Sequence, residues 1–144
     1  MHMTEKQNFT LLHPLRVRWA ECDAQAIVFN VNYFLYFDVA MTEWLRAIGF
    51  TGEKTLEFFT VHAQADYKRS AKFDDMLEIG ARCARLGKTS MTIEAAIFRG
   101  DEVLTTGKLI YVHAELNTQE KSPLPEDFIA RVLAFEKTPP ERAS

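Results

Sequence analysis

The sequence predicts an α+β fold in which a five-stranded antiparallel sheet wraps around one long buried helix. From residue 31 to 48, apolar side chains recur at the spacing of one helix face and also spread to the other faces, which is typical of a buried helix. One strand-like segment precedes this helix and four follow it, each alternating between apolar and polar residues. Because no helices separate the later strands, a doubly wound parallel sheet is excluded.

The first strand is expected between residues 12 and 20, where apolar Leu15, Val17 and Trp19 alternate with basic residues. An irregular segment, residues 21–29, separates this strand from the helix. A strand, a loop and then a long helix therefore open the fold.

The helix has one regularly apolar face, made of Tyr33, Phe37, Ala40, Met41, Trp44 and Ile48. Asn30 or Asn32 could cap its first turn, because asparagine side chains accept hydrogen bonds from free N–H groups at a helix start. Gly49 stands where a C-terminal glycine would end the helix.

The later strands are expected at residues 59–68, 77–83, 91–97 and 103–114. Turn signals at 86–88 and 99–101 separate the last three of these strands. Strands joined by such short connections are antiparallel neighbours. A short helix at 125–136 then closes the domain.

Length and composition indicate one ordinary globular domain. The chain has 144 residues, of which 47% are hydrophobic and 26% are charged, which suffices for a core of its own. We expect a single domain over residues 1–144, with a core at about 12–136. The tail at 137–144 carries Pro139 and Pro140 among charged residues and is expected to be flexible.

The composition argues against several classes of protein. The net charge is -3, from 17 basic and 20 acidic residues, whereas general nucleic-acid binding needs an excess of basic charge. The first ten residues are polar, and no apolar stretch approaches membrane-spanning length. Cys22 and Cys83 lack CxxC spacing, so neither a disulfide framework nor a cysteine zinc site is expected. We expect a cytoplasmic protein that binds neither nucleic acid nor membrane.

Residues suited to chemistry concentrate at positions 21–33. Asp23 lies in a loop seven residues before Asn30, which opens the buried helix. Because the intervening residues are mostly apolar, this carboxylate would be partly desolvated and therefore more basic. The helix start adds free N–H groups and the positive end of a dipole, so a base or nucleophile would lie beside an oxyanion site. On spacing alone, an Asp in this place is more often a turn or cap residue.

The motifs around this loop resemble the hydroxybenzoyl-CoA thioesterase family. The resemblance rests on Val-Arg-Trp-Ala-Glu-Cys-Asp at 17–23, on Ile-Val-Phe-Asn at 27–30 and Tyr33, and on the segments 37–40, 42–45, 65–68, 74–79 and 87–90. It extends from about residue 12 to 114. That family has the hot-dog fold, so the resemblance implies this fold here. It also implies hydrolysis of acyl-CoA thioesters without a cofactor or metal.

The resemblance implies a catalytic role for Asp23. The carboxylate would act as a nucleophile, forming a mixed anhydride that water cleaves, or as a general base that activates water. Both mechanisms stay open. The backbone N–H of Asn30, helped by that of Val31, would polarise the thioester carbonyl.

The resemblance also implies residues that bind the substrate. Ile27, Tyr33 and Asp38 would contact the acyl group, and Asp38 would either recognise a polar acyl group or serve as a buried structural carboxylate. Lys88 and Lys68 belong to two basic clusters that could bind the CoA phosphates. Acyl carrier protein is a possible alternative carrier. Hot-dog domains pair with active sites between subunits, which implies a homodimer or homotetramer.

The sequence departs from the family pattern at three positions. Ala26 stands where glycine is usual, Asn30 where Tyr or His is common, and Met41 where Arg is frequent. If position 26 needs a positive φ, alanine is strained there. Cys22 is expected to be a small packing residue. The alternatives are an acyl-CoA hydratase-like enzyme, which Asn30 and Asn32 in place of histidine weaken, and a non-catalytic acyl-CoA-binding protein.

Overall fold

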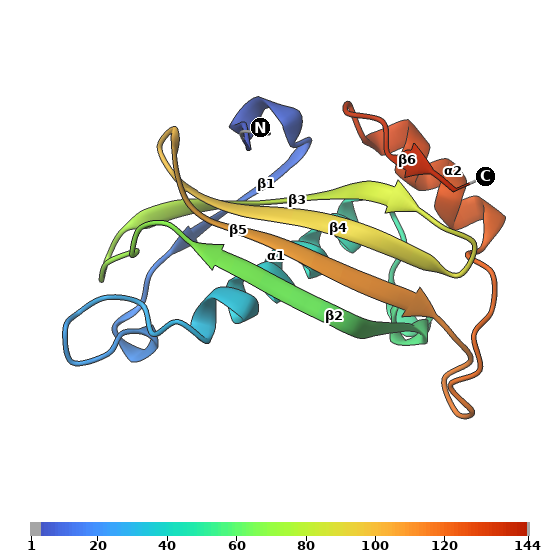
Figure 1. Ribbon diagram of the computed structural model, residues 1–144, viewed down its shortest axis with the longest axis horizontal. Coiled ribbons are helices and arrows are strands. Elements are labelled where there is room, and N and C mark those ends of the chain that lie inside the picture. The colour runs from blue at the N-terminus through green and yellow to red at the C-terminus, as the bar shows by residue number, and fades with distance from the viewer. Residues whose placement is uncertain (1–3, 144) are drawn as a thin grey trace.

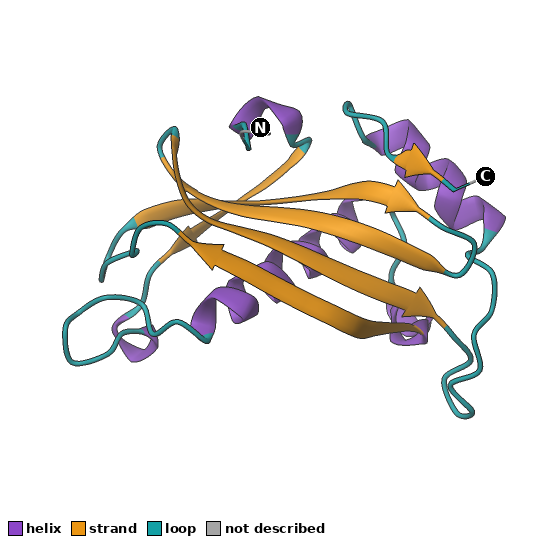
Figure 2. Ribbon diagram, in the orientation of Figure 1, coloured by secondary structure: helices purple, strands orange, loops and turns teal. Residues whose placement is uncertain are grey.

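The computed structural model describes residues 4–143 and shows one antiparallel sheet with a long helix along one face (Figures 1 and 2). The strands are β1 Leu11–Arg16, β2 Phe58–Tyr67, β3 Met76–Leu86, β4 Ser90–Arg99, β5 Glu102–His113 and the short β6 Glu141–Arg142. The helices are α1 Asn32–Ala47 and α2 Glu126–Phe135, with 3-10 turns at Lys6–Asn8, Trp19–Glu21 and Gly52–Glu57. The predicted α+β fold is confirmed. No helix within residues 4–143 is long and apolar enough to cross a membrane.

The main strands follow the order β1-β3-β4-β5-β2, and every neighbouring pair in this order is antiparallel. The two hairpins β3–β4 and β4–β5 form at the predicted turns. The next strand in the chain after β2 is β3, yet β2 pairs with β5 at one edge of the sheet. β1 forms the other edge and contains Pro14, which has no N–H to donate.

The core lies between α1 and the sheet. The buried residues of the helix are Tyr33, Tyr36, Phe37, Ala40, Met41 and Trp44. Helix and sheet approach closely at Gly107 of β5, where a Cβ atom would lie 2.5 Å from Cε2 of Phe37. This contact leaves little freedom in the position of α1.

The capping prediction is wrong at the start of α1 and is confirmed at its end. The helix starts after Val31, and no side chain caps its first turn. The Asn32 amide instead donates to the carbonyl of Glu21, so the predicted cap by Asn30 or Asn32 is wrong. Gly49 has a φ of +80°, which confirms that it ends the helix in the left-handed conformation that glycine permits.

The two ends of the chain both contribute a strand to the sheet. The first strand ends at Arg16, earlier than predicted, because the chain turns into the 3-10 segment Trp19–Glu21. The segment 137–143 returns to the body of the protein, where the N–H of Lys137 donates to Oγ1 of Thr10 at 3.0 Å. β6 then pairs in parallel with the end of β3. Residues 137–143 thus run along the body of the protein with hydrogen bonds to it, and Ser144 lies outside the described residues.

A buried carboxylate joins the C-terminal helix to the core. Glu136, just after α2, accepts hydrogen bonds from Nε1 of Trp44 at 3.0 Å and from the N–H of Cys83 at 2.5 Å. Burial raises the pKa of this carboxyl group. Glu136 thus connects α2 with α1 and β3 at the far end of α1 from its start.

Candidate active site

The loop that carries Asp23 closes as a small hairpin. The N–H of Asp23 donates to the carbonyl of Ile27 at 2.9 Å, and Cys22 forms an antiparallel bridge with Val28. Oδ1 of Asp23 accepts the N–H of Gln25 at 2.8 Å, which makes a local turn. The Asp23 side chain remains half-buried, so the carboxylate is accessible while its backbone is fixed.

The chain between this hairpin and α1 holds two free donors. Within residues 4–143, neither the N–H of Asn30 nor that of Val31 has a hydrogen-bond acceptor. The next N–H, of Asn32, donates to the carbonyl of Phe29 at 2.9 Å. Unpaired N–H groups at a helix start, together with the helix dipole, suit a developing negative charge.

Ala26 occupies the turn of the hairpin with a φ of +62°. This positive φ confirms the expectation that alanine is strained at position 26, because only glycine adopts such a φ without a steric cost. The loop keeps its shape despite alanine, since the N–H of Ala26 donates to the carbonyl of Asp23 at 3.0 Å and its own carbonyl accepts from Phe73 at 3.0 Å.

The segment that follows β2 supports the hairpin from outside. The N–H of Val28 donates to the carbonyl of Ala71 at 2.9 Å, and Ile27 forms a bridge with Lys72. Tyr33 is buried, and its hydroxyl accepts the N–H of Ala71 at 3.0 Å. Tyr33 therefore binds, from the core, the segment on which the hairpin rests, and it is not exposed to a substrate. Ile27, in contrast, is half-buried beside Asp23.

One flank of α1 connects the helix start with a pocket. Val31, Leu35, Asp38 and Thr42 lie on the same side of the helix at a spacing of three to four residues. Val31 and Leu35 are 55% and 47% exposed although both are apolar. The rise of a helix places Asp38 about 10 Å beyond Val31.

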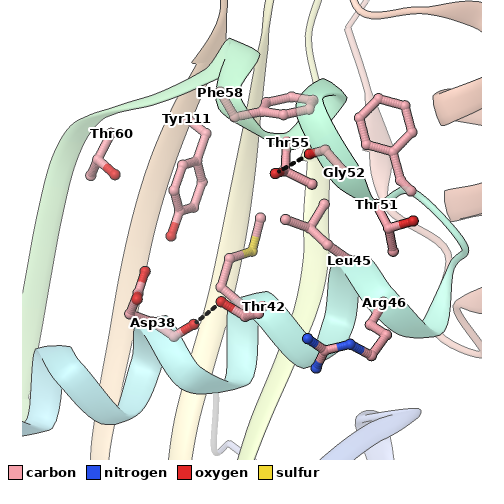
Figure 3. A pocket seen from close by; sticks show the side chains of 12 residues that line it. Asp38, Thr42, Leu45, Arg46, Thr51, Gly52, Thr55, Phe58, Thr60 and Tyr111 are labelled. Atoms are coloured by element: carbon pink, nitrogen blue, oxygen red, sulfur yellow. Dashed lines mark hydrogen bonds between the residues drawn. The ribbon is translucent and has the colours of Figure 1, made fainter.

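The pocket has a volume of about 310 Å³ and lies between α1, β2 and β5 (Figure 3). Asp38 and Thr42 border it from α1, Thr60 from β2 and Tyr111 from β5, and Figure 3 shows the Asp38 carboxylate pointing toward the Tyr111 hydroxyl. Burial and the charge of Asp38 raise the pKa of Tyr111 to about 12, so this phenol stays protonated at neutral pH. Thr60 and Tyr111 were missed by sequence reasoning, because only the pairing of distant strands brings them to Asp38.

The two predicted CoA-binding lysines lie at opposite ends of the sheet. Lys68 directly follows β2 at the end where Lys72 contacts the Asp23 loop, and both lysines are exposed. Lys88 lies in the β3–β4 turn at the other end. β4 spans this separation, which is about 30 Å for ten residues. One chain therefore does not bring Lys88 to Asp23.

Cys22 is half-buried, and its surroundings do not activate the thiol as a nucleophile. Burial, followed by the charges of Asp23 and Glu21, raises the pKa of its thiol. Its Sγ lies 3.7 Å from the carbonyl of Arg18. Residues 4–143 contain no group of three or more His, Cys, Asp or Glu side chains that could hold a metal ion.

Comparison of the sequence with models of known protein families identifies the family of this chain. A model described as the thioesterase superfamily matches residues 25–106, more than half of the chain. The chain belongs to the thioesterase superfamily. The match includes Asn30, Asp38, Lys68 and Lys88 and begins two residues after Asp23.

Individual proteins are also similar to this chain in sequence or in fold. A protein of Aquifex aeolicus (strain VF5) is 36% identical over 90 residues, which are 60% of this chain and 70% of that protein. Acyl-CoA thioesterase YbgC of Haemophilus influenzae is 27% identical over 119 residues, 79% of this chain and 88% of that protein. A crystal structure of a thioesterase from Thermus thermophilus, complexed with coenzyme A and Zn, has a TM-score of 0.84 at 24% identity, covering 92% of this chain and 98% of that chain. The predicted hot-dog fold of the superfamily is confirmed.

Replacement of Ala26 by glycine is expected to stabilise the protein. Glycine removes the steric cost of positive φ but adds unfolded-state entropy, so the net gain in the free energy of unfolding is about 0.5–1 kcal/mol. Urea denaturation measures this difference. Ala24→Gly is the control, because Ala24 lies in the same loop without a positive φ and should lose stability on the same change. Equal effects of the two changes would contradict the account of strain at position 26.

Proposed function

We propose that this chain hydrolyses acyl-CoA thioesters to the free acid and CoA, with Asp23 as nucleophile or general base. The observation that carries this proposal is the combination of an accessible carboxylate and two unpaired N–H groups in one hydrogen-bonded loop at a helix start. Membership of the thioesterase superfamily and the name of the Haemophilus relative support the same reaction.

In this mechanism the thioester carbonyl oxygen accepts hydrogen bonds from the N–H groups of Asn30 and Val31. Negative charge grows on that oxygen as the carbonyl carbon becomes tetrahedral, and the two donors and the helix dipole stabilise it. As a nucleophile, Asp23 attacks the carbon, CoA leaves as a thiolate that takes a proton from solvent, and water then cleaves the mixed anhydride to the free acid and the Asp23 carboxylate. As a general base, Asp23 takes a proton from the attacking water and passes it to the departing CoA thiolate.

The acyl group would extend along the flank of α1. Val31 and Leu35 offer exposed apolar surface, and Ile27 borders the start of the path. The path ends about 10 Å away at Asp38 and Tyr111, which are polar. An acyl group with a polar far end, such as a hydroxylated aromatic ring, would match this arrangement.

A homodimer formed through β2 would complete the CoA site. β2 has ten residues, no proline and a free outer edge, and Val61 on it is 59% exposed. Antiparallel pairing with β2 of a second copy would place the β3–β4 turn of that copy at the end of the sheet where this chain carries Asp23. Lys88 of the second copy could then join Lys68 in binding the CoA phosphates. A homotetramer would be built from two such dimers.

Asp23→Asn is expected to lower thiol release from acyl-CoA thioesters at least about 100-fold, because the amide is neither a base nor a nucleophile. The assay follows free thiol over a panel of aromatic and aliphatic acyl-CoA substrates, with the same acyl groups on acyl carrier protein. Asp101→Asn, in the exposed β4–β5 turn, is the control and should keep full activity. Full activity of Asp23→Asn would contradict the mechanism, and a folded wild type that binds acyl-CoA without releasing thiol would indicate a binding protein.

Asp38→Asn is expected to reduce selectivity for a hydroxylated acyl group. The ratio of kcat/KM for 4-hydroxybenzoyl-CoA over benzoyl-CoA should fall about 10-fold, because a charged hydrogen-bond acceptor is lost at the end of the pocket. Asp127→Asn at the exposed start of α2 is the control. Asp38 is exposed and its carboxylate makes no hydrogen bond within residues 4–143, so the expected alternative of a buried structural carboxylate is wrong. An unchanged ratio would contradict a role of Asp38 in recognising the acyl group.

The wild-type protein is expected to sediment as a dimer or tetramer in analytical ultracentrifugation. Val61→Lys should weaken association, because a charge would have to be buried at the paired edge. Leu133→Lys makes the same kind of change on an exposed apolar residue of α2 and should leave the assembly intact. A monomeric wild type would exclude the dimer.

A further inference from the structure

A second acid, Glu21, lies two residues before Asp23 and has no role in the proposed mechanism. Its side chain is buried, with 6% of the residue exposed. Oε1 accepts hydrogen bonds from the Tyr36 hydroxyl at 2.9 Å and from the N–H of Arg18 at 2.9 Å. Oε2 accepts from Nε of Arg18 at 2.9 Å and also from its Nη2. Both carboxylate oxygens are thus occupied, so Glu21 is not itself a nucleophile.

The backbone carbonyl of Glu21 makes two further contacts. It accepts the N–H of Phe29 at 3.0 Å and the side-chain amide of Asn32 at 2.8 Å. Phe29 directly precedes Asn30, and Asn32 directly follows Val31. The two unpaired N–H groups of the site are therefore flanked on both sides by groups that are bonded to one carbonyl.

The ionisation states of this cluster are fixed at neutral pH. Burial alone would raise the pKa of Glu21, but the hydrogen bonds from Arg18 and Tyr36 outweigh it and leave the pKa below its usual value. Burial and the neighbouring Glu21 carboxylate raise the pKa of Tyr36. A charged acceptor and a neutral donor therefore face each other, and hydrogen bonds to a charged group are among the stronger ones.

We propose that Glu21 is a positioning residue for thioester hydrolysis, holding the helix start with its oxyanion donors at a fixed place relative to Asp23. The side chain of Glu21 connects to the second turn of α1 through Tyr36, and its carbonyl connects to the first turn through Asn32. Asp23 follows it by two residues in the same hairpin. This inference rests on the proposed function of the site.

The chain contains a matched control in Glu136. It is also a buried carboxylate, 7% exposed, and it also accepts from an aromatic side chain of α1 and from one backbone N–H. Its partners are Trp44 and Cys83, at the far end of α1 from the Asp23 loop. Glu21→Gln and Glu136→Gln both remove a buried carboxylate, but only Glu21→Gln changes the hydrogen bonds at the proposed site. Comparing the two variants therefore distinguishes a general loss of stability from an effect on the geometry of the site.

Glu21→Gln is expected to lower kcat about 10- to 100-fold with KM within about 2-fold of wild type, because misplaced donors cost transition-state stabilisation more than substrate binding. Glu136→Gln should lower the melting temperature while kcat stays within about 2-fold. Steady-state thiol release, with circular dichroism melting of each variant, measures both effects.

Tyr36→Phe provides a second variant in case Glu21→Gln does not fold. It removes one donor without changing a charge, so a smaller loss of kcat, about 3- to 10-fold, is expected at unchanged KM. In the double variant the two losses should not multiply, because the hydrogen bond that Tyr36→Phe removes is one of those that Glu21→Gln already alters.

Three results would overturn the assignment. In the first, wild type is active, Asp23→Asn is inactive, and Glu21→Gln and Tyr36→Phe keep a kcat like that of Glu136→Gln. The positioning role of Glu21 is then wrong, while the proposed function stands. A rise in KM alone would likewise place Glu21 in substrate binding. If the folded wild type releases no thiol from any substrate, the proposed function fails and the positioning role fails with it.

Discussion

The burial of α1 against the sheet is the constraint on which the site depends. Tyr36 and Trp44 are completely buried, yet each carries a polar hydrogen that requires an acceptor. Glu21 accepts from the first and Glu136 from the second. These two buried carboxylates act at opposite ends of the helix, one on the loop before it and one on the segment after α2. The packing that forms the core therefore also sets where the helix begins relative to the Asp23 loop.

A rigid helix alone does not make an oxyanion site, because its free N–H groups must face an accessible carboxylate. Here the hairpin fixes the backbone of Asp23 relative to the helix start, since Cys22 bridges Val28 and the carbonyl of Glu21 accepts the N–H of Phe29. The loop cannot shift along the helix without breaking these bonds. Ala26 shows that the loop geometry is maintained even at a steric cost, as expected where a particular backbone shape is needed.

Local patterns in the sequence were sufficient for α1, for the β3–β4 and β4–β5 hairpins and for Gly49, because helix periodicity and tight turns are encoded within a few residues. Features that depend on distant pairing were not predictable in this way. The partner of β2, the docking of residues 137–143 and the meeting of Tyr111 with Asp38 all arise from contacts between segments far apart in the chain. Asp23 was found through a family motif, whereas its spacing alone favoured a turn residue.

The residues proposed to set the rate of hydrolysis and those proposed to select the acyl group lie in different parts of the fold. The groups proposed to act on the thioester lie in the loop and at the helix start, whereas the pocket is formed by the middle of α1 with β2 and β5. The pocket residues Asp38 and Tyr111 make no hydrogen bond to the loop within residues 4–143. If the pocket holds the acyl group as proposed, substitutions in it change the acyl group that fits without moving the carboxylate or the N–H donors. Because Glu21 holds the loop and the helix start together, its loss would affect turnover for every acyl group alike.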